Sequence, residues 1–267
     1  MDVKTNYKIA TALGVPLFNF YYHPHFIGKN LIPTGEALIL CGNHLNVLDQ
    51  FPVICALRSV DKEIITHWMA KKEYFEKPFI GSFFRNTGAI EVDRYGDPSK
   101  AKEEAINYLK KGESIGIFPE GTRNIYHPLK LKIEEIEKQK ERTIIQYRQR
   151  LIDNIEYNKI MNYYKEQLLN IDKEVDMVRS KLKKRDIELI DSDLVLPFKY
   201  GAVSMARVTG AVIVPFAVTG SFSFRSKDLM VRFGEGFSVY RYDNLELAND
   251  KLRNDVIKLM KKNYKMS

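Results

Sequence analysis

The chain has 267 residues, and 45% of them are apolar, which is enough for a packed core and excludes a disordered or collagen-like chain. Its 42 basic and 34 acidic residues give a net charge of +8, which favours an anionic partner. Such a partner could be a nucleic acid, an anionic membrane surface or a phosphorylated substrate. Two cysteines cannot form a disulfide framework, and no signal peptide or spanning segment of roughly 18 apolar residues is recognisable, so we expect a reducing, cytosolic setting.

The first predicted element is Tyr7–Tyr22, which is rich in apolar and aromatic residues but contains Gly14 and Pro16. This segment is too short to span a membrane and is typical of an interfacial segment or of a strut packed on the core. The histidines of His23-Pro24-His25 follow it. No cysteine or carboxylate joins them at ligand spacing, so we expect no metal site.

Apolar runs and helical patterns then alternate along the chain. Strands are predicted at residues 37–41, 64–69, 89–92, 114–118, 211–218 and 229–233, and helices at 99–111 and 200–209. The apolar strand runs predict an α/β sheet covered by helices on both faces. Pro215 lies inside one predicted strand and indicates a bulge or a sheet edge there.

Residues 129–196 contain no glycine or proline, although the chain has 15 and 10 of them. Apolar residues in the second half alternate at spacings of three and four, which is typical of a coiled-coil seam: Met161, Tyr164, Leu168, Ile171, Val175, Val178 and Leu182. A single helix of this length would extend about 100 Å. Because both flanks belong to one globular domain, we predict a helical hairpin that turns near Asn154, Asn158 or Asn162.

The predicted organisation is therefore a domain formed by residues 1–128 and 197–267, with an inserted α-helical coiled-coil hairpin at 129–196. The hairpin is either a solvated spacer or a docking or dimerisation arm. At the other end, Asp250–Lys265 has six basic and two acidic residues, with its apolar residues on one helical face. This helix either lies on anionic lipid or packs on the domain.

One loop carries a histidine and an aspartate directly after the strand at 37–41: Gly42-Asn43-His44-Leu45-Asn46-Val47-Leu48-Asp49. Residues five apart point about 140° away from each other on a helix, so they pair only if His44 precedes the helix and Asp49 starts it. The carboxylate would then hold one ring nitrogen and leave the other basic toward a substrate hydroxyl. Alternatively, His44 caps the helix or satisfies a buried polar group.

A second loop follows the strand at 114–118: Pro119-Glu120-Gly121-Thr122-Arg123. The glycine allows close approach of the backbone, the threonine can cap, and the arginine offers a planar fork for a phosphate. The alternative is a tight turn with a surface ion pair between Glu120 and Arg123.

Four blocks stand in order along the chain: NHLNVLD (43–49), GAIEVDR (88–94), FPEGTR (118–123) and VPFAV (214–218). Together with AKKEYFEKPFIGSFFRNT (70–87), PFKYGA (197–202) and VRFGEGF (231–237), they resemble the glycerolipid acyltransferase family, and most closely its 1-acylglycerol-3-phosphate acyltransferases. The resemblance covers roughly residues 25–128 and 197–240 and implies a mixed sheet flanked by helices. In the family a short loop joins FPEGTR to the lysine-glycine block, whereas here 68 residues without glycine or proline intervene.

The resemblance implies that His44 is the general base for a free hydroxyl, which then attacks a thioester directly, and that Asp49 orients His44 and stabilises its imidazolium. Cys41 then has a packing role. Arg123 matches the family's phosphate-binding arginine, with Glu120, Gly121 and Thr122 in the same motif. Two further candidates for the headgroup are Arg94 and Lys71, although Lys71 could equally be a solvated surface lysine. No cofactor or metal is implied.

The implied reaction moves a fatty acyl group from acyl-CoA or an acyl-carrier-protein to 1-acylglycerol 3-phosphate, giving phosphatidic acid. Both acceptor and product are lipids, so we expect a peripheral protein on an anionic membrane surface at the cytoplasmic side. The alternatives are acylation of glycerol 3-phosphate or another lysophospholipid, or a non-catalytic lipid-binding scaffold that uses the coiled-coil arm. The 129–196 hairpin could hold a second copy or a protein partner. No nucleic-acid module or dense basic stripe accompanies the charge, so nucleic acid is not expected.

Overall fold

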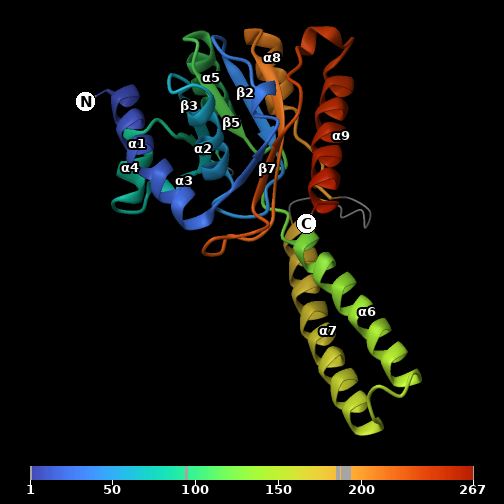
Figure 1. Cartoon of the computed structure of the whole chain (residues 1–267). Coiled ribbons are helices and arrows are strands. Elements are labelled where there is room, and N and C mark those ends of the chain that lie inside the picture. Colours follow the sequence, from blue (N-terminus) through green and yellow to red (C-terminus); the bar gives the residue numbers. More distant parts are fainter. Residues whose placement is uncertain (1, 94–95, 185–186, 188–193, 267) are drawn as a thin grey trace. The chain divides into compact units, whose positions relative to one another are not determined.

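The computed structural model describes residues 2–93, 96–184, 187 and 194–266, and these form two compact units (Figure 1). The first, here the sheet unit, comprises Met1–Arg123 and Pro197–Ser267. The second, here the hairpin unit, comprises Asn124–Leu196.

The sheet unit is built on a seven-stranded mixed sheet with the order β1-β7-β6-β2-β5-β3-β4. Its strands are β1 His25–Ile27, β2 Leu38–Gly42, β3 Thr66–Lys71, β4 Ile90–Val92, β5 Ser114–Ile117, β6 Val212–Thr219 and β7 Met230–Phe233. In this order, the five strands β6, β2, β5, β3 and β4 are parallel to one another, whereas β7 runs antiparallel to β6. The predicted α/β sheet is confirmed, and the three-residue strand β1 is an addition that no apolar run predicted.

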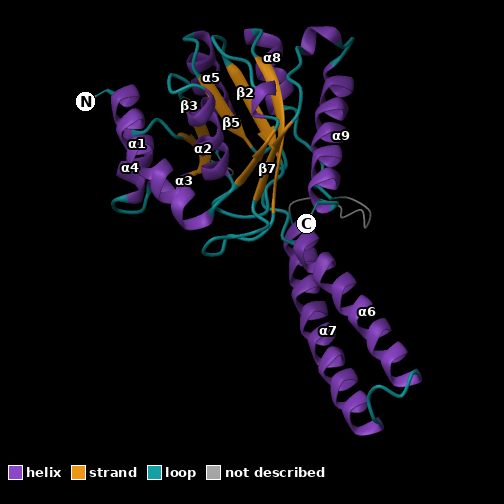
Figure 2. Ribbon diagram, viewed as in Figure 1, coloured by secondary structure: helices purple, strands orange, loops and turns teal. Residues whose placement is uncertain are grey.

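Helices cover both faces of this sheet (Figure 2). Side chains alternate between the faces of a strand, so Leu38 and Leu40 share one core with Val53 of α2 (Gln50–Val60), while Ile39 and Cys41 point to the opposite face. Helices α5 (Pro98–Lys110), α8 (Gly201–Thr209) and α9 (Leu245–Tyr264) pack on that opposite face. Short elements complete the unit: α3 Lys72–Phe75, α4 Ile80–Asn86, η1 Lys29–Leu31 and η2 Val239–Arg241.

The N-terminal segment is one continuous helix, α1 (Val3–Tyr22), despite Gly14 and Pro16 inside it. Pro16 removes one backbone donor, a cost that usually ends or kinks a helix. Contacts with α2 offset it, because Tyr7 and Thr11 are buried and Phe18 and Tyr22 pack against the core. Among the described residues, no helix combines the length and the apolar content needed to cross a bilayer.

Pro215 does not lie at a sheet edge, because β6 pairs with both β2 and β7. The pairing with β7 begins one residue later, at Phe216, and the carbonyl of Pro215 accepts from the backbone N–H of Gly234 at 2.8 Å. The missing N–H of the proline therefore falls where the ladder between β6 and the segment after β7 is interrupted, as at a bulge.

The C-terminal helix α9 packs on the sheet rather than offering its apolar face to lipid. Leu252, Val256 and Met260 are fully buried, and Leu259 is 7% exposed. Helix α9 lies against β6 and β7, so this apolar face completes the core. Of the two readings of the tail, packing on the domain is the correct one.

The hairpin unit consists of two helices that pack against each other, α6 (Tyr126–Arg148) and α7 (Asn154–Lys183). Ile171, Val175, Val178 and Leu182 of α7 are buried together with Tyr126 and Leu129 of α6. The connection is residues 149–153, just before Asn154, whereas Asn158 and Asn162 lie inside α7. The left-handed residue of the connection is Arg150, with φ 58°, rather than an asparagine.

Candidate active site

The five parallel strands end at one edge of the sheet, and the two motif loops leave from this edge. The His44 loop follows β2 and the Gly121 loop follows its neighbour β5. In open α/β sheets, ligands bind outside the carboxyl ends of the parallel strands. The predicted site residues therefore gather where a substrate is expected to bind.

Asn43 fixes the start of the histidine loop. Its buried side chain makes two hydrogen bonds to the backbone of Val218 on β6: Nδ2 donates to the carbonyl, and Oδ1 accepts from the N–H, both at 2.8 Å. These bonds extend the β2–β6 pairing by one residue beyond Gly42. The backbone that leads into His44 is therefore held by the neighbouring strand.

Asp49 and His44 form the predicted pair. Nδ1 of His44 lies 3.0 Å from Oδ2 of Asp49, and the same oxygen accepts from the backbone N–H groups of Leu45 and Asn46 at 2.7 Å. Asp49 is 1% exposed and stands directly before α2. Because a carboxylate oxygen only accepts, Nδ1 carries the ring proton and Nε2 keeps a lone pair.

The two motif loops are tied together by a buried carboxylate. Oε1 of Glu120 accepts from the backbone N–H of His44 at 2.7 Å, and Glu120 is 1% exposed. The surface ion pair considered for Glu120 and Arg123 is therefore wrong for Glu120, which lies inside the site. Its position brings the FPEGTR motif into direct contact with the histidine loop.

An aromatic floor supports the imidazole of His44. The ring of Phe118 stacks on it with centroids 4.1 Å apart and planes 9° from parallel. Phe118 in turn contacts Trp68 and Phe216, with centroids 5.2 and 6.1 Å away. Gly116 makes room for this floor, because a Cβ there would lie 2.4 Å from the Trp68 ring. The His44 side chain is 19% exposed, so it remains accessible to a substrate.

The FPEGTR loop turns tightly at Gly121, whose φ of +66° favours glycine. The side chain of Lys199 passes over this glycine, since a Cβ at position 121 would lie 3.2 Å from its Nζ. The backbone N–H of Lys199 donates to the carbonyl of Pro119 at 2.9 Å. Arg123 is exposed and Thr122 is half-buried. Two cations therefore stand at this loop, Arg123 on it and Lys199 over it, and no site role was predicted for Lys199.

Lys71 and Arg94 were the outlying candidates. Lys71 ends β3, which neighbours β5, so it stands at the same edge of the sheet as the two loops, and it is half-buried. Arg94 lies outside the described residues. Cys41 is fully buried in β2, and burial raises the pKa of its thiol, in agreement with the predicted packing role.

Tyr264 belongs to no motif and was not predicted to act at this site. Burial raises the pKa of its phenol, and the negative charge of the Asp49 carboxylate raises it further. Asn263, next to it in α9, accepts through Oδ1 from Nε of Arg232 at 2.7 Å, which fixes the last turn of the helix on β7. Oδ1 of Asp49 is buried and has no hydrogen-bond partner among the described residues.

The Acyltransferase family model matches residues 23–219, about three quarters of the chain. The chain belongs to the acyltransferase family. The matched range contains every predicted site residue of this acyltransferase-family chain, from His44 to Arg123. Helix α1 and Tyr264 lie outside it, so the family match carries no information about them.

Two relatives are named 1-acyl-sn-glycerol-3-phosphate acyltransferase. One, from Bacillus subtilis (strain 168), is 47% identical over 118 residues, which are 43% of this chain and 53% of the relative. The other, from Borreliella burgdorferi, is 36% identical over 99 residues, which are 36% of this chain and 38% of the relative. The match thus spans about half or less of the length of these relatives.

The fold also resembles a solved structure, the 1-acyl-sn-glycerophosphate (LPA) acyltransferase PlsC from Thermotoga maritima. The TM-score is 0.57 at 16% sequence identity, and the match covers 96% of this chain and 78% of the other. At this identity the likeness establishes the fold alone, so the reaction has to be inferred from the site residues.

Proposed function

We propose that this acyltransferase-family chain transfers an acyl group from a thioester donor to the free hydroxyl of 1-acylglycerol 3-phosphate, giving phosphatidic acid and a free thiol. The observation that carries the proposal is the His44–Asp49 pair, in which Nδ1 donates to a buried carboxylate and Nε2 is left with its lone pair on an accessible ring. The names of the two relatives support lysophosphatidic acid as the acceptor.

In the proposed step, Nε2 of His44 takes the proton of the acceptor hydroxyl as its oxygen bonds to the thioester carbonyl carbon. The C–S bond then breaks, and the leaving thiolate takes the proton from the imidazolium. Asp49 stabilises that imidazolium at 3.0 Å. The proposed transfer is direct, without a covalent enzyme intermediate, and coenzyme A and an acyl-carrier-protein are both suitable thiols.

We assign the acceptor phosphate to Arg123, with Gly121 and Thr122 shaping the turn that presents it and Glu120 holding that loop against His44. Arg123 is exposed on a loop in contact with the catalytic pair, and a guanidinium matches a phosphate with two parallel hydrogen bonds. Lys71, the last residue of β3, and Arg94, two positions after β4 in the sequence, are further ligands in this proposal, and Lys199 adds a cation over Gly121. No metal or cofactor is required.

The test is acyl transfer from acyl-CoA and from an acyl-carrier-protein thioester to 1-acylglycerol 3-phosphate, glycerol 3-phosphate and a second lysophospholipid. We expect the first acceptor to react fastest and His44→Ala to lower turnover about a thousandfold, in the range that general-base catalysis supplies. The matched control is His25→Ala, which removes an exposed histidine outside the site. Undiminished turnover in His44→Ala refutes the mechanism, and an inactive wild type with all acceptors favours a non-catalytic scaffold.

We further propose that the protein is peripheral on the cytoplasmic face of the membrane and that α1 contacts the lipid. Ile9, Leu13, Leu17 and Phe20 form one helical stripe and are 45%, 74%, 68% and 61% exposed. Phe79, which is 90% exposed, precedes α4, a helix that contacts α1. We expect Leu13→Ser/Leu17→Ser to weaken co-sedimentation with lipid vesicles and Val208→Ser, an exposed apolar position on α8, to leave it unchanged.

A further inference from the structure

We propose that the tip of the hairpin unit is a second membrane-contact site, specific for anionic phospholipid. The tip is defined here as residues 145–155, the end of α6, the connection and the start of α7. This proposal does not rest on acyl transfer, because it concerns only residues of the insert.

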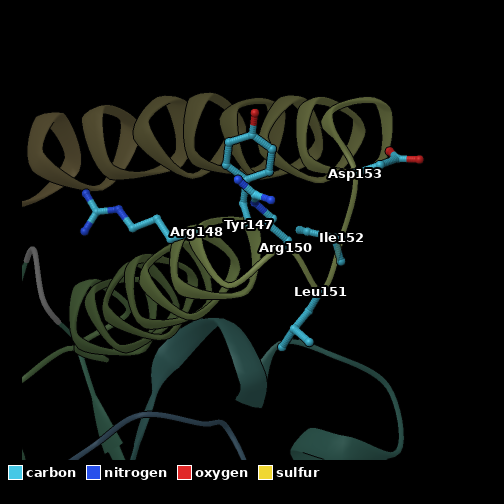
Figure 3. A pocket seen from close by; sticks show the side chains of 6 residues that line it. All are labelled: Tyr147, Arg148, Arg150, Leu151, Ile152 and Asp153. Atoms are coloured by element: carbon cyan, nitrogen blue, oxygen red, sulfur yellow. The ribbon is translucent and has the colours of Figure 1, made fainter.

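The tip exposes apolar side chains that the hairpin does not need for its own packing. Leu151 is 68% exposed, Ile155 80% and Ile145 51%, whereas the residues that hold the two helices together are buried. Figure 3 shows Leu151 pointing away from both helices of the hairpin. Tyr147 is 39% exposed and stacks on Tyr157 with centroids 4.4 Å apart, so it presents an aromatic ring with a polar end.

Two arginines stand beside these apolar side chains. Arg148 and Arg150 are both exposed, and no described acidic residue forms an ion pair with either. The acidic residue of the tip, Asp153, caps α7 by accepting from the backbone N–H of Glu156 at 2.8 Å. Its charge therefore serves the helix N-terminus, and two guanidinium groups remain available to an anionic partner.

The backbone gives an independent indication that Arg150 is functional. Arg150 lies two residues beyond the end of α6 at φ 58°, where glycine or asparagine is usual and where another side chain costs about 1 kcal/mol or more. A bulky cation kept at a position that favours glycine points to a use for its side chain.

The residues of the tip surround a hollow of about 520 Å³, lined by Tyr147, Arg148, Arg150, Leu151, Ile152 and Asp153 (Figure 3). It is large enough to admit a phospholipid headgroup. Arginine and tyrosine at the headgroup level, with leucine and isoleucine below it, is the arrangement by which interfacial helices bind anionic bilayers. An anionic bilayer fits both the charge and the apolar surface of the tip.

The direct test places a reporter at the tip of the full-length chain. In Leu151→Trp, the indole emission should shift to shorter wavelength with vesicles of equal phosphatidylglycerol and phosphatidylcholine, and should not shift with phosphatidylcholine alone. The native Trp68 is buried and contributes a constant background. Leu169→Trp, at a position that is 56% exposed on α7 away from the tip, is the matched control and should not shift.

The second test removes the charge. Each basic side chain near an anionic surface contributes about fivefold to binding, so Arg148→Gln/Arg150→Asn should bind about thirtyfold more weakly to the anionic vesicles. Asparagine tolerates the left-handed backbone of position 150, so the fold is retained. Lys173→Gln/Lys181→Gln removes two exposed charges from α7 outside the tip and should bind like wild type.

An emission shift at 169 as large as at 151, or an equal loss of binding in both charge variants, would overturn the proposal in favour of non-specific adsorption. A shift at 151 that needs no vesicles and grows with protein concentration would overturn it in favour of contact with a second copy. Failure of acyl transfer in the wild type would refute the proposed function and leave the emission result standing.

Discussion

The described residues of the sheet unit include two histidine–carboxylate pairs, and only one of these is suited to catalysis. His44 contacts Asp49 at 3.0 Å and stacks on Phe118; His67 contacts Glu113 at 2.6 Å and stacks on Tyr108. The residue types match, yet the His44 side chain is 19% exposed and His67 is fully buried. The accessible pair follows the carboxyl end of β2, whereas His67 is the second residue of β3.

The hydrogen bonds explain the difference in capability. Nδ1 of His67 lies 2.7 Å from the carbonyl of Gly88, and Nε2 faces the Glu113 carboxylate, which also pairs with Lys4 at 3.0 Å. Both ring nitrogens are engaged by buried oxygen atoms, so neither is open to a substrate. A histidine beside a carboxylate is thus a base only if its second nitrogen is left open to a substrate.

The largest expected effect is that of Asp49→Asn. The amide can donate to Nδ1, which would move the ring proton to Nε2 and remove the base. We expect turnover to fall about ten-thousandfold, as in catalytic triads whose aspartate becomes asparagine. Steady-state acyl-transfer kinetics measure the loss, and urea unfolding checks that the variant is folded. Turnover within about tenfold of wild type would contradict the assigned role of Asp49.

Glu113→Gln should instead lower stability. It breaks a buried pair and should reduce the free energy of unfolding by about 3 kcal/mol at neutral pH, with turnover per folded molecule unchanged. Urea unfolding and active-site-normalised turnover are the measurements. A loss of turnover without a loss of stability would contradict the structural role assigned to the His67–Glu113 pair.

The pH dependence sharpens this prediction. Burial by itself raises the pKa of Glu113, but the bonds from Lys4 and His67 outweigh burial and hold the pKa below its ordinary value of 4.5. A lowered pKa gives stability that is present above about pH 4.5 and is lost as the pH falls through the folded-state pKa. The stability gap between wild type and Glu113→Gln should therefore close in acid. A gap that stays constant from neutral to acid pH would refute this linkage.

The stacked rings give a matched pair of smaller changes. Phe118→Leu removes the floor under His44 and should lower turnover about tenfold, because a displaced base loses alignment. Tyr108→Leu removes the ring on His67 and should cost about 1 kcal/mol of stability without changing turnover. Equal effects of the two variants on turnover would remove the distinction between the pairs.

The smallest expected effect is that of Tyr264→Phe. It keeps the ring and removes the phenol oxygen, whose pKa the Asp49 carboxylate raises, so turnover should fall by less than about fivefold, equivalent to about 1 kcal/mol. The pH profile of kcat/KM tests for a positioning role, since a purely structural change leaves the apparent pKa of the base where it was. Tyr240→Phe, which loses a hydrogen bond to the Arg207 carbonyl, is the control.

The sequence predicted what depends on short-range patterns. Apolar runs located the strands to within two residues, and the spacing of His44 and Asp49 predicted their pairing across the start of α2. What it did not predict depends on contacts between distant segments. Glu120 binds the His44 backbone only because β2 and β5 are neighbours, and the charge of Asp49 acts on Tyr264 only because α9 packs on β6 and β7.

Long-range packing also overrode local signals. Gly14 and Pro16 read as interruptions, yet α1 is continuous because α2 supports it. The apolar face of α9 was compatible with lipid or with a core, and only the position of the sheet decides between them. Strand β1 has three residues, too few for a periodic pattern to register.

The bonds between Asn43 and Val218 have a consequence for the order of folding. These residues are 175 positions apart, and the whole insert is made between them. During synthesis the histidine loop therefore emerges early but stays without its anchor until β6 has followed. A contact of such sequence separation forms late and slowly. The site is thus completed only after nearly the whole chain has been made, so a prematurely ended chain that lacks β6 would contain His44 and Asp49 without the strand that fixes their loop.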